Sequence, residues 1–130
     1  MKIIIDNKVI MDQDIDMIHE EAQGDYKEKG DFSYLVYTNS EKERLVLKFN
    51  DVSLSVTRFG TPQTTMLFKK DAFAAAQIPS PLGLQRLVTK TTHFKLQKQA
   101  RELTLHYQLL SHPEAETALA GYQMRLRWLD

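Results

Sequence analysis

The stretch LVLKFNDVSLSVT, residues 45–57, decides the fold class. Apolar side chains recur at every second position on both sides of a polar pair, Asn50-Asp51. A period of two places alternate side chains on the same face of a β-strand. Asn and Asp favour tight turns because their side chains bond to nearby backbone groups. The stretch therefore predicts two adjacent antiparallel strands joined by a hairpin.

The same alternation extends over most of the chain. Apolar and aromatic residues take every second position in 103–109 and in 122–128, which predicts half-buried antiparallel strands. Short polar or Gly/Pro-containing turns separate the segments. We expect strands at about 2–11, 15–28, 32–39, 43–50, 52–59, 63–69, 84–98, 101–111 and 119–129.

The segment Asp71–Gly83 has no clear period. Its alanine run, Ala74–Ala76, fits either a helical turn capped by Asp71 or a strand that continues towards Pro79. Pro79 and Pro81 have no backbone N–H group, so we do not expect this segment to be central in a sheet.

These strands leave two architectures, a sandwich and a closed barrel. The connections are short and sequential, whereas sandwiches usually need longer crossovers. Closure also removes exposed sheet edges. We therefore predict an all-β protein with one domain, residues 1–130, that forms an antiparallel up-and-down β-barrel of about 8–10 strands.

Composition excludes several classes of protein. The 130 residues include 42% hydrophobic and 26% charged side chains, with 17 basic and 17 acidic residues. The chain has no cysteine, which excludes disulfides, thiol catalysis, zinc fingers and iron–sulfur clusters. No run approaches the roughly 20 apolar residues of a membrane span, and Asp6 interrupts any signal-like start. We expect a cytoplasmic protein that does not interact with membranes.

Scattered residues along the predicted strands give a family resemblance. These are Gly24-x-Tyr26, Tyr34-Leu35-x-Tyr37, Arg58-x-Gly60, Phe68, Gly83 and Thr91. In their order and spacing the chain resembles the YwiB-like family of small bacterial proteins of unknown function, from about Ile15 to the last strand. The resemblance implies a lipocalin-like or calycin-like barrel and brings no assigned activity. The chain departs from the family at Ala74–Pro81, where alanines and a second proline replace a more strand-like, aromatic-containing segment.

Arg58 is the first candidate for a functional residue. It continues the inward register of Val56, so its guanidinium is expected to point into the barrel. A buried guanidinium needs an acceptor, and Glu20 or Glu21 on an earlier strand could supply it. The alternative is that Arg58 lies at the strand end, where it pairs or extends to solvent and orders the turn at Gly60.

Aromatic side chains give a second group of candidates. Tyr26, Tyr34, Tyr37, Tyr107 and Trp128 could line a cavity for a ligand, or could fill the interior. A barrel of about eight strands is just wide enough for either arrangement. As a ligand-binding set we single out Tyr26, Tyr34, Arg58, Tyr107 and Trp128.

Metal and catalytic motifs are not found in the sequence. The four histidines have no ligand-like spacing, and the acids Asp12, Asp14 and Asp16 lack the glycine and final glutamate of an EF-hand. There is no GxSxG motif and no glycine-rich phosphate-binding motif. We therefore expect no metal, no cofactor and no enzyme activity.

Charge is divided unevenly along the chain. Seven basic and twelve acidic residues up to Thr57 give −5, and ten basic and five acidic residues from Arg58 onward give +5. A basic stripe comprises Arg86, Lys90, Lys95, Lys98 and Arg101. It could follow a phosphate backbone, with His93 and Phe94 stacking on bases, but a solvated outer face is the preferred interpretation.

Three functional hypotheses remain. The first is a binding module that holds a small, mostly apolar molecule in the barrel lumen. The alternative is a filled barrel that acts as a protein-interaction or regulatory module through its surface, including as a homodimer. Contact with nucleic acid through the basic stripe is the third. An accessible interior favours the first hypothesis, and a filled one favours the second.

Overall fold

A computed structural model describes residues 1–130 and contains ten strands and no helix. Nine strands begin and end within one residue of the predicted bounds, so the all-β prediction is confirmed. The strands are β1 (Lys2–Met11), β2 (Asp14–Lys29), β3 (Phe32–Thr38), β4 (Arg44–Phe49), β5 (Ser53–Phe59), β6 (Thr64–Lys69), β7 (Phe73–Ser80), β8 (Gly83–Gln97), β9 (Glu102–Leu110) and β10 (Ala120–Leu129).

The strands form a closed barrel in which each strand pairs with its neighbours in sequence. The last strand returns to the first, where Lys2–Ile10 pair antiparallel with Gly121–Leu129. The predicted antiparallel up-and-down barrel is therefore confirmed. Closure leaves each of the ten strands with a neighbour on both sides, which limits the exposed backbone edges.

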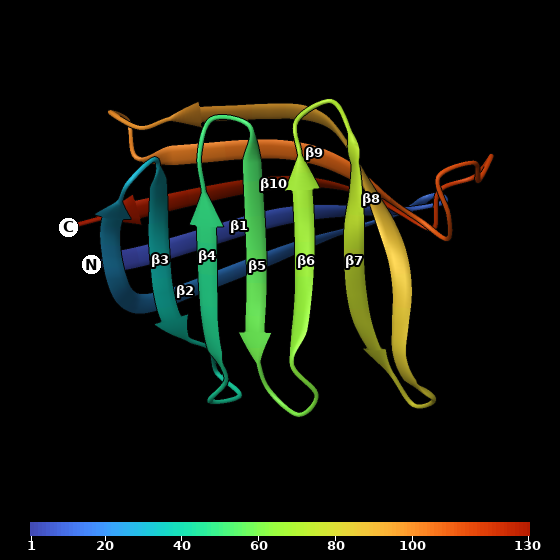
Figure 1. The fold of residues 1–130 in the computed structure, drawn as a ribbon, viewed down its shortest axis with the longest axis horizontal. Coiled ribbons are helices and arrows are strands. Elements are labelled where there is room, and N and C mark those ends of the chain that lie inside the picture. Colours follow the sequence, from blue (N-terminus) through green and yellow to red (C-terminus); the bar gives the residue numbers. More distant parts are fainter.

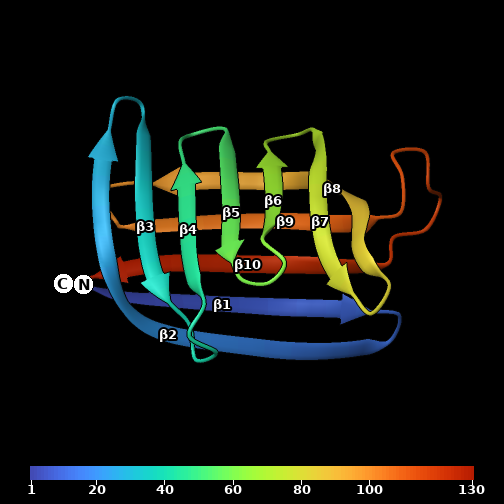
Figure 2. The same cartoon turned by 60° about the horizontal axis from the view of Figure 1, so that its bottom comes forward.

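The barrel is flattened into two layers whose strands cross at a steep angle (Figure 1). Strands β3 to β7 form one layer, and β9, β10 and β1 form the other. The long strands β2 and β8 bend and take part in both layers, as Figure 2 also shows. In β2, Asp14–Gln23 pair with β1 and Gly24–Lys29 pair with β3. In β8, the register shifts between Thr91 and His93.

Gly24 lies where β2 leaves β1 and begins to pair with β3. A Cβ atom at this position would overlap the carbonyl oxygen of Val36 and would lie 2.5 Å from Cδ1 of Ile3. It would also lie 2.9 Å from Cβ of Tyr37. Only glycine therefore allows the two layers to approach this closely at the corner of the barrel.

The structure settles the conformation of the segment Asp71–Gly83, for which the sequence allowed either a helical turn or a strand. Phe73–Ser80 form a strand and not a helical turn. The expectation that this segment would not be central in the sheet was wrong, because β7 lies between β6 and β8. Its pairing with β6 is limited to Met66 and Ala76, whereas the whole strand pairs with β8. Pro79 is tolerated because no β6 residue pairs with it.

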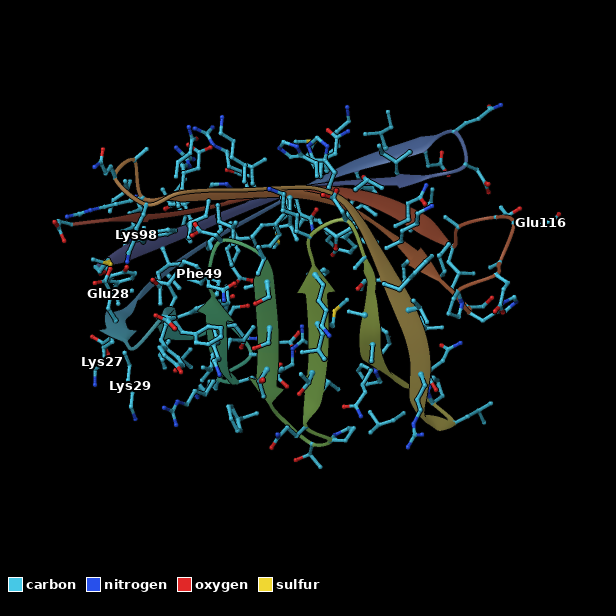
Figure 3. All side chains as sticks on the ribbon, turned by 45° about the horizontal axis from the view of Figure 1, so that its top comes forward. Lys27, Glu28, Lys29, Phe49, Lys98 and Glu116 are labelled. Atoms are coloured by element: carbon cyan, nitrogen blue, oxygen red, sulfur yellow. The ribbon has the colours of Figure 1, made fainter.

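The main core cluster occupies one end of the space between the layers, and a smaller buried cluster of Ala76, Leu87 and Leu109, with Met66, Ile78 and Tyr122 packed against it, lies elsewhere on the inner face. Fifteen buried residues form the main cluster, and Trp128 is 1% exposed within it. The Trp128 ring stacks on Tyr26 at 5.6 Å and lies 5.3 Å from Phe49, which is labelled between the layers in Figure 3. We call this region the packed end. Its cluster comprises Ile3, Leu35, Tyr37, Leu45, Leu47, Phe49, Leu54, Phe68, Phe94, Leu103, Leu105, Tyr107, Met124, Leu126 and Trp128.

Candidate functional site

The inner face of the barrel is not uniformly buried. On β5, Leu54 is 1% exposed, whereas Val56, which points to the same side, is only half-buried. Tyr122 on β10 is also half-buried although it shares the inner face with the fully buried Leu126. We call this less buried part of the inner face the open end. It comprises Asn7, Glu20, Val56, Met66 and Tyr122, and it adjoins Tyr107 of the main core cluster, against which Val56, Met66 and Tyr122 pack.

Two stacked tyrosines form one wall of the open end. The rings of Tyr107 and Tyr122 lie 4.6 Å apart and are nearly parallel. Burial raises the pKa of both phenols, so both are neutral near pH 7 and can donate a hydrogen bond. Asn7 lies close enough to Tyr107 to offset part of the rise in the Tyr107 pKa.

Two buried polar atoms at the open end have no hydrogen-bond partner. They are Oδ1 of Asn7 on β1 and Oε1 of Glu20 on β2. Both atoms are acceptors. An unpaired buried acceptor costs about 1–3 kcal/mol, so this wall favours a molecule that donates hydrogen bonds.

Glu20 also faces Tyr37. Burial raises the pKa of Tyr37, and a hydrogen-bonding contact between the Glu20 side chain and the Tyr37 hydroxyl, followed by the repulsion of the Glu20 negative charge, raises it further. The nearby charge of Arg58 acts in the opposite direction on the Tyr37 pKa. Glu20, Tyr37 and Arg58 thus form a polar group at the edge of the open end.

Arg58 has the predicted inward register but not the predicted partner. It pairs in register with Leu45 and Thr64, and its side chain is 44% exposed at the end of β5. Its Nε lies 3.9 Å from Oε1 of Glu43, and neither Glu20 nor Glu21 makes an ion pair with it. Because Arg58 is near the strand end, its guanidinium reaches the rim of the barrel, as the alternative interpretation held.

Glu21 cannot serve as an interior partner. It follows Glu20 in β2, so its side chain points to the outer face. There it pairs with Nζ of Lys2 at 3.2 Å and with Nε2 of His19 at 3.1 Å.

Three of the predicted ligand-binding aromatics lie away from the open end. Tyr26 and Trp128 stack on each other and fill the packed end. The Tyr26 hydroxyl donates to Oε1 of Glu28 at 2.7 Å. Tyr34 points outward, which corrects the prediction, because Leu35 takes the inward position of β3. Tyr34 borders a surface hollow of about 500 Å³ over β2, β3 and β4.

Of the predicted set, Tyr107 borders the open end from within the main core cluster, and Arg58 lies at the rim. Sequence reasoning did not identify Asn7, Met66 or Tyr122. The signal for Asn7 was present, since it is the one polar residue at the alternate positions Ile3, Ile5, Asn7 and Val9 of β1. A polar residue in such an apolar series indicates an interior position at which a polar side chain is required.

The basic stripe lies on β8 and on the turn that follows it. Nζ of Lys98 lies 2.8 Å from Oε1 of Glu28, and both residues are labelled at the packed end in Figure 3. The guanidinium of Arg101 lies 2.6 Å from Oδ2 of Asp130. Two of the five cations are therefore neutralised by carboxylates, and the bend of β8 divides the stripe between the two layers.

The outer face of β8 and β9 carries two adjacent histidines. The rings of His93 and His106 lie 4.7 Å apart. Burial, and to a smaller extent the neighbouring His93, lowers the pKa of His106.

No group of three or more metal-ligating side chains is arranged to hold an ion. The structure contains no helix that is long and apolar enough to cross a membrane.

Comparison with known proteins places the chain among domains without an assigned activity. Residues 3–126 match the family described as "Domain of unknown function (DUF1934)". The crystal structure of the YwiB protein from Bacillus subtilis is similar, with a TM-score of 0.77 and 16% sequence identity. The similarity covers 99% of this chain and 91% of that one. At this identity the match shows the fold alone. The comparison with curated proteins found no match.

Proposed function

The chain belongs to the DUF1934 family of domains of unknown function, which confirms the YwiB-like resemblance, and we propose that it is a small-molecule-binding module. The ligand occupies the open end of the barrel. One observation carries the proposal: the buried acceptor atoms of Asn7 and Glu20 lack partners on an inner face that remains accessible. Such a wall combines apolar surface with a few convergent polar groups, as ligand sites do.

The lining indicates the class of ligand. Val56, Met66 and the stacked ring of Tyr122 offer apolar surface, which suits a mostly apolar body. The oxygens of Asn7 and Glu20 accept hydrogen bonds, so the ligand carries an N–H or O–H group at its inner end. Arg58 and Glu43 at the rim contact the outer end of the bound molecule.

Native mass spectrometry of the untreated protein tests this proposal. A bound molecule adds a discrete mass that disappears on denaturation. Asn7→Leu and Glu20→Gln are expected to reduce the occupied fraction, since each removes an acceptor or its charge. Tyr34→Phe on the outer face is the control and should retain the mass. Bare protein, with no saturable binding of apolar amines or alcohols in a subsequent titration, would contradict the proposal.

The surface-interaction hypothesis keeps a specific observation in its favour. Ile15, Met17 and Ile18 on β2 are 57%, 70% and 54% exposed. Isolated exposed apolar residues are common, but Ile15 and Met17 lie next to each other on the outer face of β2, and Ile18 adds apolar surface on its other face. Nucleic-acid contact is less supported, because Lys98 and Arg101 are paired within the protein.

A further inference from the structure

The first half of β2 has an unpaired backbone edge. Asp14–Gln23 pair with β1 along one edge, and β3 begins to pair with β2 only at Gly24. No strand pairs with the opposite edge of Asp14–Gln23. In Figure 2 this part of β2 runs along the border of its layer, below β1. A free edge of this length presents a row of N–H and C=O groups to a further strand.

The side chains along this edge are exposed on both faces. Every residue from Met11 to His19 is exposed, including the apolar Ile15, Met17 and Ile18. Natural proteins usually protect free edges with lysine, proline, bulges or very short strands. The segment 11–23 contains no lysine, no arginine and no proline. The edge thus lacks the usual protection against strand addition.

The charges on the edge are acidic and largely unneutralised. The inner side of this part of β2 carries Asp14, Asp16, Ile18 and Glu20, and none of its three acids makes an ion pair. The outer side differs, because His19 and Glu21 already pair with Asp6 and Lys2. Antiparallel pairing of two copies through this edge would bring two sets of unpaired acids together, which is unfavourable. The edge therefore favours a basic partner over a second copy of itself.

We propose that the free edge of β2, Asp14–Gln23, is a docking site for an extended segment of another protein in which basic and apolar residues alternate. Added as a further strand, the segment places its basic side chains on the inner side, beside Asp14, Asp16 and Glu20. Its apolar side chains lie on the outer side, beside Ile15 and Met17. The two proposed sites share Glu20, but the other residues that define the docking edge, Asp14, Ile15, Asp16 and Met17, lie outside the open end.

The test uses a labelled, end-capped peptide of about nine residues in which lysine and valine alternate, long enough to cover most of the edge. Fluorescence anisotropy measures its affinity for the intact protein. Asp14→Asn/Asp16→Asn is expected to weaken binding about tenfold through loss of two cross-strand charge pairs. Asp25→Asn/Asp31→Asn is the matched control, since it removes the same charge from exposed residues elsewhere, and should change affinity less than about twofold.

A second peptide tests the backbone pairing. Proline in place of the central valine removes an N–H group and is expected to weaken binding about tenfold or more. Four results would overturn the proposal. The first two are that the lysine–valine peptide does not bind, or that the proline peptide binds with the same affinity. The third is that both double variants lose the same affinity for the peptide. The fourth is that the protein associates with itself through β2 and the peptide does not reverse this. Circular dichroism and melting curves confirm that each variant is folded.

Discussion

His19 lies between two carboxylates on the outer face of the barrel. Its Nδ1 is 2.5 Å from Oδ1 of Asp6, and its Nε2 is 3.1 Å from Oε1 of Glu21. The hydrogen bond to Asp6 is the main cause that raises the pKa of His19, and the same bond lowers the pKa of Asp6. Asp6 also lies 3.3 Å from a guanidinium nitrogen of Arg127. The group thus connects β2, β1 and β10 where the barrel closes.

The raised pKa of His19 predicts a dependence of stability on pH. Protonated His19 stabilises the fold below its unfolded pKa of 6.5, and this contribution disappears as pH rises through the higher folded pKa. His19→Asn should therefore destabilise the protein more at about pH 5.5 than at about pH 8, as measured by urea unfolding. An NMR titration of the ring should show the raised pKa directly. An equal loss at both pH values would contradict the prediction.

His106 provides a control of opposite sign. Its lowered folded pKa means that stability is present above the unfolded value of 6.5 and is lost as pH falls through the lower folded pKa. When the pH falls below 6.5, the His106→Asn variant should therefore lose less unfolding free energy than the unaltered protein. The His19→Asn variant should not show this smaller loss.

At the scale of one element, the bend in β2 decides how the two layers meet. The strand changes partner between Gln23 and Gly24, from β1 to β3. The residues before the bend leave a free edge, and the residues after it complete the packed end. Glu28, for example, accepts a hydrogen bond from Tyr26 and pairs with Lys98.

Gly24→Ala is expected to destabilise the protein by about 1–3 kcal/mol, because an added Cβ overpacks the corner. Part of the obstruction is the Val36 backbone carbonyl, which cannot change rotamer to make room. Gly121→Ala is the matched control in a strand, since the nearest atoms to its added Cβ are 4.0 Å away. The control should change the free energy of unfolding by less than about 0.5 kcal/mol. Equal effects in urea denaturation would mean that Gly24 is not a close-contact position.

At the scale of the whole molecule, the barrel interior has two ends that differ in how completely their side chains are buried. The packed end holds the fully buried side chains and supplies most of the apolar burial that stabilises the fold. The open end retains accessible apolar surface and unpartnered acceptors. Under the proposed function, stability and ligand binding therefore depend on different side chains of the same inner face.

Two truncations of similar size test this division. Leu105 is 0% exposed, so Leu105→Ala should cost about 3–4 kcal/mol through lost contacts and a new cavity. Met66 is half-buried at the open end, and Met66→Ala should cost less than about half of that. Fluorescence of Trp128, the single tryptophan, reports the unfolding of both variants. Equal costs would indicate an interior filled at both ends and would favour a surface function.

The sequence by itself determined nine of the ten strands, their antiparallel order and much of the core, but not the strand β7. Alternation in 45–57, 103–109 and 122–128 assigned faces correctly, because the side-chain period of a strand is a local property. The short turns then led to a meander barrel, since antiparallel neighbours need only hairpins. The inward register of Arg58 followed from the same period.

Only the tertiary structure decided which inward residues are buried and what they meet. Arg58 reaches the rim and Glu43 because β5 ends there, and Trp128 is buried because Tyr26 and Phe49 close over it from other strands. The unpartnered state of Glu20 and the free edge of β2 depend on where β2 bends. These features arise from contacts between residues far apart in sequence, which a period along one strand does not specify.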